Sequence, residues 1–174
     1  LLRGKIKNSG KTETTLEVWL AGSEGGGKTS YTQKITGTIR QLGLEKTVKL
    51  LGTRRDVPSL LASADALVLS TLIPESFGRV LIEAGAVGTV SVATALGGAL
   101  EIIEDGKDGL LVPPRDEEAM AEALLRLIQN PREAKKMSER LHKKVEQRFF
   151  LDQMAEKTLE VYREVKTQKK ILVI

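Results

Sequence analysis

Two carboxylates stand at a fixed separation in the segment STLIPESFGRVLIEAGAVG, where Glu83 follows Glu75 by eight residues. The apolar spacing after Glu75 predicts a helix that contains Glu83. Eight residues at helical rise span about 12 Å, too far to share one proton but suited to the two ends of an elongated ligand. Between the glutamates, Ser76, Phe77 and Gly78 open the helix, and the unpaired N–H groups and positive pole there suit a diphosphate.

A glycine pair, Gly97 and Gly98, follows the next expected strand. Glycines let the backbone approach a ligand closely, and this pair is expected to open a short helix from Ala99 to Ile103. Two helix openings in one crevice form a stronger anion site than either alone. One carboxylate would then take the hydroxyls of a ribose and the other those of a second sugar.

A second anion-binding pattern starts at Gly22, where residues 22–29 read GSEGGGKT and fit G-x-x-x-x-G-K-[ST]. A strand is expected before it and a helix after it, as in P-loop nucleoside triphosphatases. Against that reading, no later strand ends in an aspartate placed to hold magnesium, because Asp65 precedes its strand. The triphosphatase stays open as an alternative.

Three further interpretations of the same residues stay open. Glu75 and Glu83 could be a glycosidase pair, which requires carboxyls within about 5–10 Å across one sugar bond. They could be ordinary helix charges without a ligand. The runner-up is a nucleotide-binding module of the same fold without catalytic activity.

Short apolar runs alternate with helical patterns along the first two thirds of the chain. This alternation predicts an α/β fold, a Rossmann-like parallel sheet of about five or six strands flanked by helices, with extra C-terminal helices. Ligands bind beyond the carboxyl ends of strands in such sheets. We expect one domain over 1–165 and a tail over 166–174. Strands are expected at 15–22, 47–52, 65–70, 90–94 and 108–114, and helices at 31–42, 56–64, 78–86, 99–105, 115–129, from 131 and at 152–165.

Burial follows from the same patterns. The strand at 65–70 is apolar throughout, which predicts burial on both faces. Asp116 and Pro131 are expected to start the helices that follow them. The apolar stripes of the last three helices should be buried: Met120, Leu124 and Leu127 or Ile128; Met137, Leu141, Val145 and Phe149; Met154, Leu159 and Tyr162.

Composition narrows the function classes. The 174 residues include 3% aromatics, few for a protein that stacks nucleic acid, and no cysteine. The single histidine, His142, is expected to be a surface residue and not a metal ligand. No apolar run reaches the roughly 20 residues of a membrane span, and no signal peptide is expected. The net charge of +4 concentrates in residues 131–174, which leaves a peripheral contact with an anionic membrane open.

The segment from Pro74 to Pro114 resembles the retaining nucleotide-sugar glycosyltransferases of family 4, which have the two-domain GT-B fold. The matching pieces are PESFGRVLIEAGAVG and VATALGGALEIIEDGKDGLLVPP, with a weaker match from Leu16 on. The family's E-A-M-A stands here as Glu83-Ala84-Gly85-Ala86.

The resemblance implies a role for each matching residue. Glu75 would be catalytic, contacting the transferred sugar and stabilising positive charge near its anomeric carbon. Glu83 would bind the ribose hydroxyls of the donor. The remaining donor-binding residues would be Ser76, Phe77, Gly78, Arg79 and Val80, mainly through backbone N–H groups, with Gly97 and Gly98, and with Gly22, Gly52 and Arg54 flanking the base.

The resemblance also implies the wider setting. The reaction would be transfer of a sugar with retention from a UDP-, GDP- or ADP-sugar, without metal or other cofactor. The acceptor would be held by an N-terminal domain that this sequence does not contain, so these 174 residues alone are expected to be inactive. The location would be cytoplasmic, with a peripheral place at the inner face of the membrane left open.

Overall fold

The computed structural model describes residues 1–8, 15–22, 30–74 and 76–167. These residues form two compact units, Leu1–Leu60 and Leu61–Ile174, each of which combines helices with parallel strands. The expected α/β class is confirmed. Within the described ranges the five strands form two hydrogen-bonded sheets, one of two strands and one of three, where the sequence predicted a single sheet.

The first unit is built on two parallel strands, β1 (Val18–Ala21) and β2 (Val48–Gly52). The intervening helix α2 (Ser30–Gln41) lies where the apolar period predicted it. Helix α1 (Leu2–Asn8) precedes the strands, and α3 (Val57–Ala62) leads out of the unit. Gly43, with φ of +61°, ends the α2 turn as expected for a glycine.

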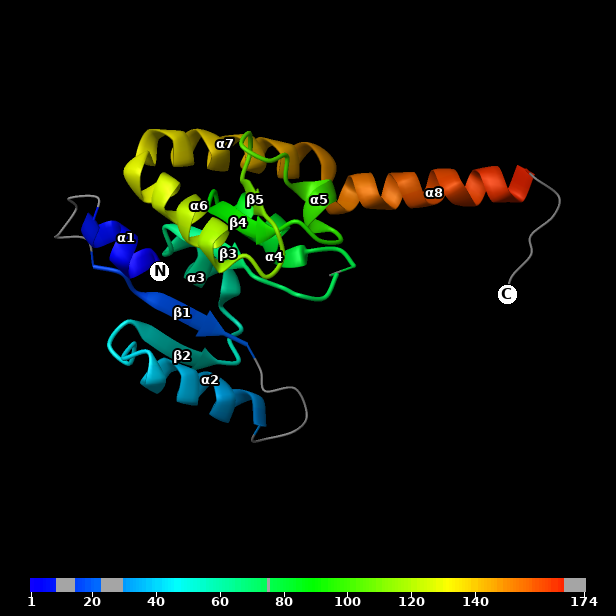
Figure 1. Cartoon of the computed structure of the whole chain (residues 1–174). Coiled ribbons are helices and arrows are strands. Elements are labelled where there is room, and N and C mark those ends of the chain that lie inside the picture. Colours follow the sequence, from blue (N-terminus) through cyan, green and yellow to red (C-terminus); the bar gives the residue numbers. More distant parts are fainter. Residues whose placement is uncertain (9–14, 23–29, 75, 168–174) are drawn as a thin grey trace. The chain divides into compact units, whose positions relative to one another are not determined.

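The second unit has the strand order β3-β4-β5, all parallel (Figure 1). The strands are β3 (Ala66–Leu69), β4 (Val90–Thr94) and β5 (Leu110–Val112). Helix α4 (Arg79–Ala86) connects β3 to β4, and the short α5 (Ala99–Ile102) connects β4 to β5. The chain continues as α6 (Glu117–Gln129), α7 (Pro131–Arg148) and α8 (Leu151–Thr167).

The core of the second unit lies on both faces of β4, whose five residues are all buried. Because side chains alternate across a strand, Val90 and Val92 face one cluster and Ala93 faces the other. The first cluster includes Leu127 of α6 and Met137 of α7. The second is formed mainly by α4, α5 and the later turns of α7: Leu81, Ile102, Ile103, Leu141 and Val145.

Two helix starts in this unit match the sequence prediction. The carboxylate of Asp116 accepts a hydrogen bond from the Ala119 N–H at 2.8 Å and so caps α6. Pro131 occupies the first turn of α7. The stripes of α6 and α7 pack into the core as expected, through Leu127 and through Leu141 with its neighbours.

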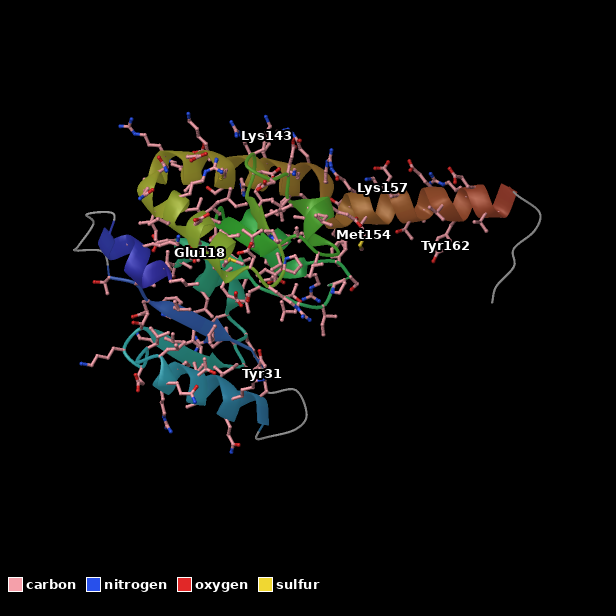
Figure 2. All side chains as sticks on the ribbon, in the orientation of Figure 1. Tyr31, Glu118, Lys143, Met154, Lys157 and Tyr162 are labelled. Carbon is pink, nitrogen blue, oxygen red and sulfur yellow. The ribbon has the colours of Figure 1, made fainter. Side chains whose placement is uncertain are left out.

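Two burial predictions were wrong. The strand β3 is only half-buried, with Val68 42% exposed, because β3 is an edge strand of its sheet and β4 holds the centre. On α8 the side chains of Met154 and Tyr162 are 60% and 66% exposed, and Leu159 is also exposed. Figure 2 shows Met154 and Tyr162 standing out from α8 on the same side. The helical period identifies the apolar face but not whether another element covers it.

Candidate functional site

The turn that opens α4 is shaped around Gly78. This residue has φ of +72° and ψ of +39°, a left-handed conformation that glycine adopts without strain. It is also enclosed, since an added Cβ would lie 3.2 Å from Cδ1 of Ile102. The turn that opens α4 therefore packs closely against Ile102 of α5.

The N–H groups at the start of helix α4 are the second feature of the site. The N–H of Leu81 is the first to donate back, to the Gly78 carbonyl at 2.9 Å. Within the described residues the N–H groups of Arg79 and Val80 have no acceptor, and Gly78 supplies no side-chain cap. These amides can donate hydrogen bonds to an anion at this opening, and the positive pole of the helix attracts it.

The glycine pair after β4 lies directly against this opening. A Cβ added at Gly98 would come within 2.6 Å of the carbonyl carbon of Phe77 and 2.7 Å of its oxygen. Only glycine permits that approach of two backbones. The structure thus brings the Gly97–Gly98 corner and the Phe77–Gly78 turn together, as the sequence pattern predicted.

Helix α5 does not provide the free N–H groups that the sequence predicted for it. It is one turn long, and its first amides are used locally: Ala99 donates to Leu96 O and Leu100 to Gly97 O. The expectation of a second helix opening with free N–H groups is therefore not met by α5 itself. Within the described residues it is the amides of Gly97 and Gly98 that lack an acceptor.

The carboxylate of Glu83 lies on α4, one turn after the opening. Its side chain is 36% exposed, and one carboxylate oxygen lies 3.6 Å from the Arg79 guanidinium. The Arg79 side chain is 82% exposed. Sequence reasoning assigned only the backbone of Arg79, and the i,i+4 spacing to Glu83 was the signal for its side chain. A cation and a carboxylate therefore border the same helix opening.

The ring of Phe77 has a partner that the sequence did not indicate. It packs edge-on against Phe149, at the end of α7, with ring centroids 6.3 Å apart and planes at 78°. Edge-to-face pairs of this kind are favourable. Phe77 is still 54% exposed, so part of the residue faces solvent despite this contact.

Helix α7 packs closely against α4. A Cβ on Gly85 would lie 2.7 Å from Val145 and 2.9 Å from Leu141, so glycine here allows the two helices to touch. The Nδ1 atom of His142 lies 2.9 Å from the Gly85 carbonyl oxygen. His142 is thus a half-buried packing residue, and no metal-binding group of His, Cys, Asp or Glu occurs among the described residues.

Three predicted donor-binding residues lie in the first unit. Gly22 donates its N–H to the Gly52 carbonyl at 2.9 Å, where β1 and β2 end. Arg54 follows and forms a bidentate pair with Asp56, at 2.9 and 2.6 Å. These hydrogen bonds raise the pKa of the Arg54 guanidinium and lower that of the Asp56 carboxyl. The guanidinium thus has a carboxylate partner within its own loop.

Two predictions fall outside the described residues. Glu75, expected to be catalytic, is one, and residues 23–29 of the GSEGGGKT pattern are the other. The described neighbours agree with that pattern, since β1 ends at Ala21 and α2 begins at Ser30. Ser76 is described and exposed, next to Phe77.

The described site residues of the second unit differ in exposure: Ser76, Phe77 and Arg79 are exposed, whereas Gly78 and Gly98 are buried. Two surface hollows lie elsewhere, one at the α6–α7 turn around Pro131 and one between α5 and α7 near Lys143. Neither includes Glu83, Gly98 or residues 76–80. No helix in the described ranges is long and apolar enough to cross a bilayer.

Comparisons with known proteins place this geometry in context. The family model described as "Glycosyl transferases group 1" matches residues 7–145. An exopolysaccharide phosphotransferase of Streptomyces coelicolor is 34% identical over 78% of this chain and 14% of its own length. A D-inositol 3-phosphate glycosyltransferase of Corynebacterium urealyticum is 30% identical over 87% of this chain and 36% of its own length.

A solved structure is similar as well. Anabaena Alr3699/HepE in complex with UDP-glucose matches with a TM-score of 0.83 and 29% identity, over 91% of this chain and 44% of that chain. The chain therefore spans less than half the length of each of these relatives.

Proposed function

The chain belongs to the glycosyl transferases group 1 family, and on that premise we propose that it is the donor-binding domain of a retaining, family 4 glycosyltransferase. In this proposal it forms the C-terminal half of a GT-B enzyme and binds a nucleotide-diphosphate sugar. Transfer to an acceptor requires an N-terminal domain, so this chain binds the donor without turnover.

One observation carries the proposal, the contact between Gly98 and the Phe77 backbone at the opening of α4. It brings the opening of α4, where the amides of Arg79 and Val80 have no acceptor among the described residues, against the Gly97–Gly98 corner. Amides at a helix opening bind phosphate groups through hydrogen bonds and the helix dipole. In the proposal the diphosphate of the donor binds at this opening.

The flanking side chains suit the remainder of the donor. In the proposal the Glu83 carboxylate accepts hydrogen bonds from ribose hydroxyls, and Arg79 adds positive charge beside the diphosphate. Glu75 contacts the transferred sugar, and Gly22, Gly52 and Arg54 border the base. The similar Anabaena protein has been solved in complex with UDP and with UDP-glucose, which makes a UDP-sugar the first donor to test.

The proposed chemistry is a substitution at the anomeric carbon. The bond from that carbon to the diphosphate oxygen breaks, the acceptor oxygen bonds on the same face, and the acceptor proton passes to the departing diphosphate. The amides at α4 stabilise the negative charge that develops on this leaving group. A cytoplasmic location, where nucleotide sugars are the substrates, belongs to the same proposal.

A peripheral contact with an anionic membrane is the open part of that location. It is supported by the excess of Lys and Arg over Asp and Glu in residues 131–174. Part of this positive charge lies on α7, where Arg140, Lys143, Lys144 and Arg148 line one surface hollow. Sedimentation with vesicles of phosphatidylcholine, with and without phosphatidylserine, tests it.

Thermal unfolding with added nucleotides tests the donor-binding function. UDP-, GDP- and ADP-glucose are compared with ATP, and a donor at one hundred times its dissociation constant is expected to add about 2.7 kcal/mol of stability. The variant Lys28→Ala separates the alternatives, because a P-loop would lose ATP binding whereas sugar-nucleotide binding would be unchanged. A shift with ATP alone that Lys28→Ala abolishes would identify a triphosphatase instead.

A further inference from the structure

Thr94, the last residue of β4, is buried, with 4% of its surface exposed. Its hydroxyl donates to the carbonyl oxygen of Thr71 at 2.8 Å, while the Leu69 carbonyl is farther away, at 3.4 Å. Thr71 lies two residues after the end of β3, in the segment that leads toward Ser76 and Phe77. The side chain of Thr94 therefore ties that loop to the central strand.

The anchored part of the loop is itself ordered by hydrogen bonds. The Thr71 hydroxyl donates to the Ile73 carbonyl at 2.7 Å, and the Ile73 N–H points back to the same hydroxyl at 3.3 Å. These two bonds fix Ile73 relative to Thr71, so the Thr94 hydroxyl anchors this turn as well as the Thr71 carbonyl.

The backbone of Thr94 starts the other loop of the site. Its carbonyl accepts the Leu96 N–H at 2.8 Å, and the next amide, that of Ala95, donates to Val112 of β5 at 2.8 Å. The Gly97–Gly98 corner follows immediately, and Gly98 contacts the Phe77 backbone. Thr94 is thus bonded to both loops whose meeting forms the candidate donor site.

We propose that Thr94 is a positioning residue for donor binding, because its hydroxyl holds the Thr71–Ile73 turn of the loop after β3 in register with the Gly97–Gly98 corner. This inference rests on the proposed function. The hydroxyl does not touch the donor and acts through the Thr71 carbonyl. Its loss lets the two backbones drift apart and weakens the hold on the diphosphate.

The same strand offers a matched control. Thr89 directly precedes β4, is 5% exposed, and donates its hydroxyl to the Leu61 carbonyl at 2.7 Å. Its chemistry, burial and bond length match those of Thr94. It lies at the opposite end of the strand, away from both loops, so it reports the loss of a buried hydrogen bond without any effect on the site.

The experiment compares Thr94→Val, Thr94→Ser and Thr89→Val in the same chain. Melting temperature is recorded, and the dissociation constant for UDP-glucose is measured by calorimetry well below melting. Both valine variants are expected to melt earlier by a similar margin. Only Thr94→Val should raise the dissociation constant, by up to about tenfold, which is the limit if the whole free energy of one hydrogen bond is coupled to binding, and Thr94→Ser should restore it.

Three results would overturn the inference. The first is a dissociation constant for UDP-glucose that is the same in Thr94→Val as in the unchanged chain. The second is an equal rise of this constant in Thr89→Val. The third is a Thr94→Ser variant that binds UDP-glucose as weakly as Thr94→Val. Should Thr94→Val fail to fold, Thr94→Ala, which places no methyl against the Thr71 carbonyl, is compared with Thr89→Ala. If the unchanged chain binds no sugar nucleotide, the proposed function fails first and this inference with it.

Discussion

The α-carbon of Gly98 lies so close to the peptide of Phe77 that a methyl group there would stand 2.6 Å from the Phe77 carbonyl carbon. This contact joins two loops that follow neighbouring strands, β3 and β4. The atoms that oppose an added methyl group at Gly98 all belong to the Phe77 backbone. Room for the methyl group therefore requires a backbone shift and cannot come from the rotation of a side chain.

Gly98→Ala is therefore expected to separate the two loops. The strain should cost about 1–3 kcal/mol of unfolding free energy and weaken UDP-glucose binding at least tenfold. Gly37→Ala is the control, because an added Cβ there has no atom within 4 Å and Gly37 lies inside α2. That variant should be neutral or stabilised by up to about 1 kcal/mol, since alanine favours the helix. Unchanged donor binding by Gly98→Ala would show that the loop contact is not part of the site.

Glu83→Gln replaces a hydrogen-bond acceptor that carries charge. Loss of a charge-assisted bond to a ribose hydroxyl should raise the dissociation constant for UDP-glucose about tenfold or more, while the melting temperature of the free chain stays nearly constant. Calorimetric titration measures the first effect. Glu139→Gln, an exposed glutamate on α7, should bind as the unchanged chain does. Equal affinities for Glu83→Gln and Glu139→Gln would remove Glu83 from the site.

Lys144 and Asp108 form a buried ion pair behind α5. The Asp108 side chain is 2% exposed, its other oxygen accepts the Glu104 N–H at 2.7 Å, and Lys144 also donates to Ile102 O at 3.0 Å. Lys144→Met leaves a buried carboxylate unpaired and should destabilise the chain by about 3–5 kcal/mol.

The double variant Asp108→Asn/Lys144→Met keeps an acceptor for the Glu104 N–H and buries no charge. It should be more stable than Lys144→Met alone, as chemical denaturation can measure. Strict additivity of the two single effects would show that the two side chains do not interact.

Arg126 of α6 and Glu133 of α7 form a hydrogen-bonded pair across the turn that joins their helices, with the closer contact at 2.5 Å. This bond lowers the pKa of the Glu133 carboxyl below its ordinary value of 4.5. A depressed folded-state pKa gives stability that is present above the unfolded-state pKa and is lost as the pH falls through the folded-state value.

The unfolding free energy of Glu133→Gln should therefore fall slightly less on acidification than that of the unchanged chain. Melting temperatures between about pH 3 and pH 7 measure the difference between variant and unchanged chain, which should shrink as the pH falls. Glu139→Gln serves again as the control on the same helix. A difference that grows toward acid pH would contradict the sign.

The sequence predicted those parts of the fold that depend on local pattern. The alternation of apolar runs located all the strands of the described ranges, and the Asp116 cap and Pro131 marked helix starts because their signals are local. Tertiary contacts carry no such signal. The exposure of Met154 and Tyr162, and the edge position of β3, depend on which surfaces meet, which periodicity does not specify.

The site was predictable to a similar extent. Glycines at 78, 97 and 98 signalled turns, and the structure confirms that they meet. Contacts made by residues distant in sequence were not predictable, such as Phe149 beside Phe77 and the Thr94 hydroxyl on Thr71. The roles of Glu75 and Ser76 and of Gly22, Gly52 and Arg54 stay predictions.

Backbone amide spectra of the isotopically labelled chain, recorded while UDP-glucose is added, test the donor site most directly. The account predicts saturable shifts of the amide signals of Gly78, Arg79, Val80, Gly97 and Gly98, with smaller changes along α6. Binding that leaves these five signals unmoved, or a titration without any saturable shift, would contradict it.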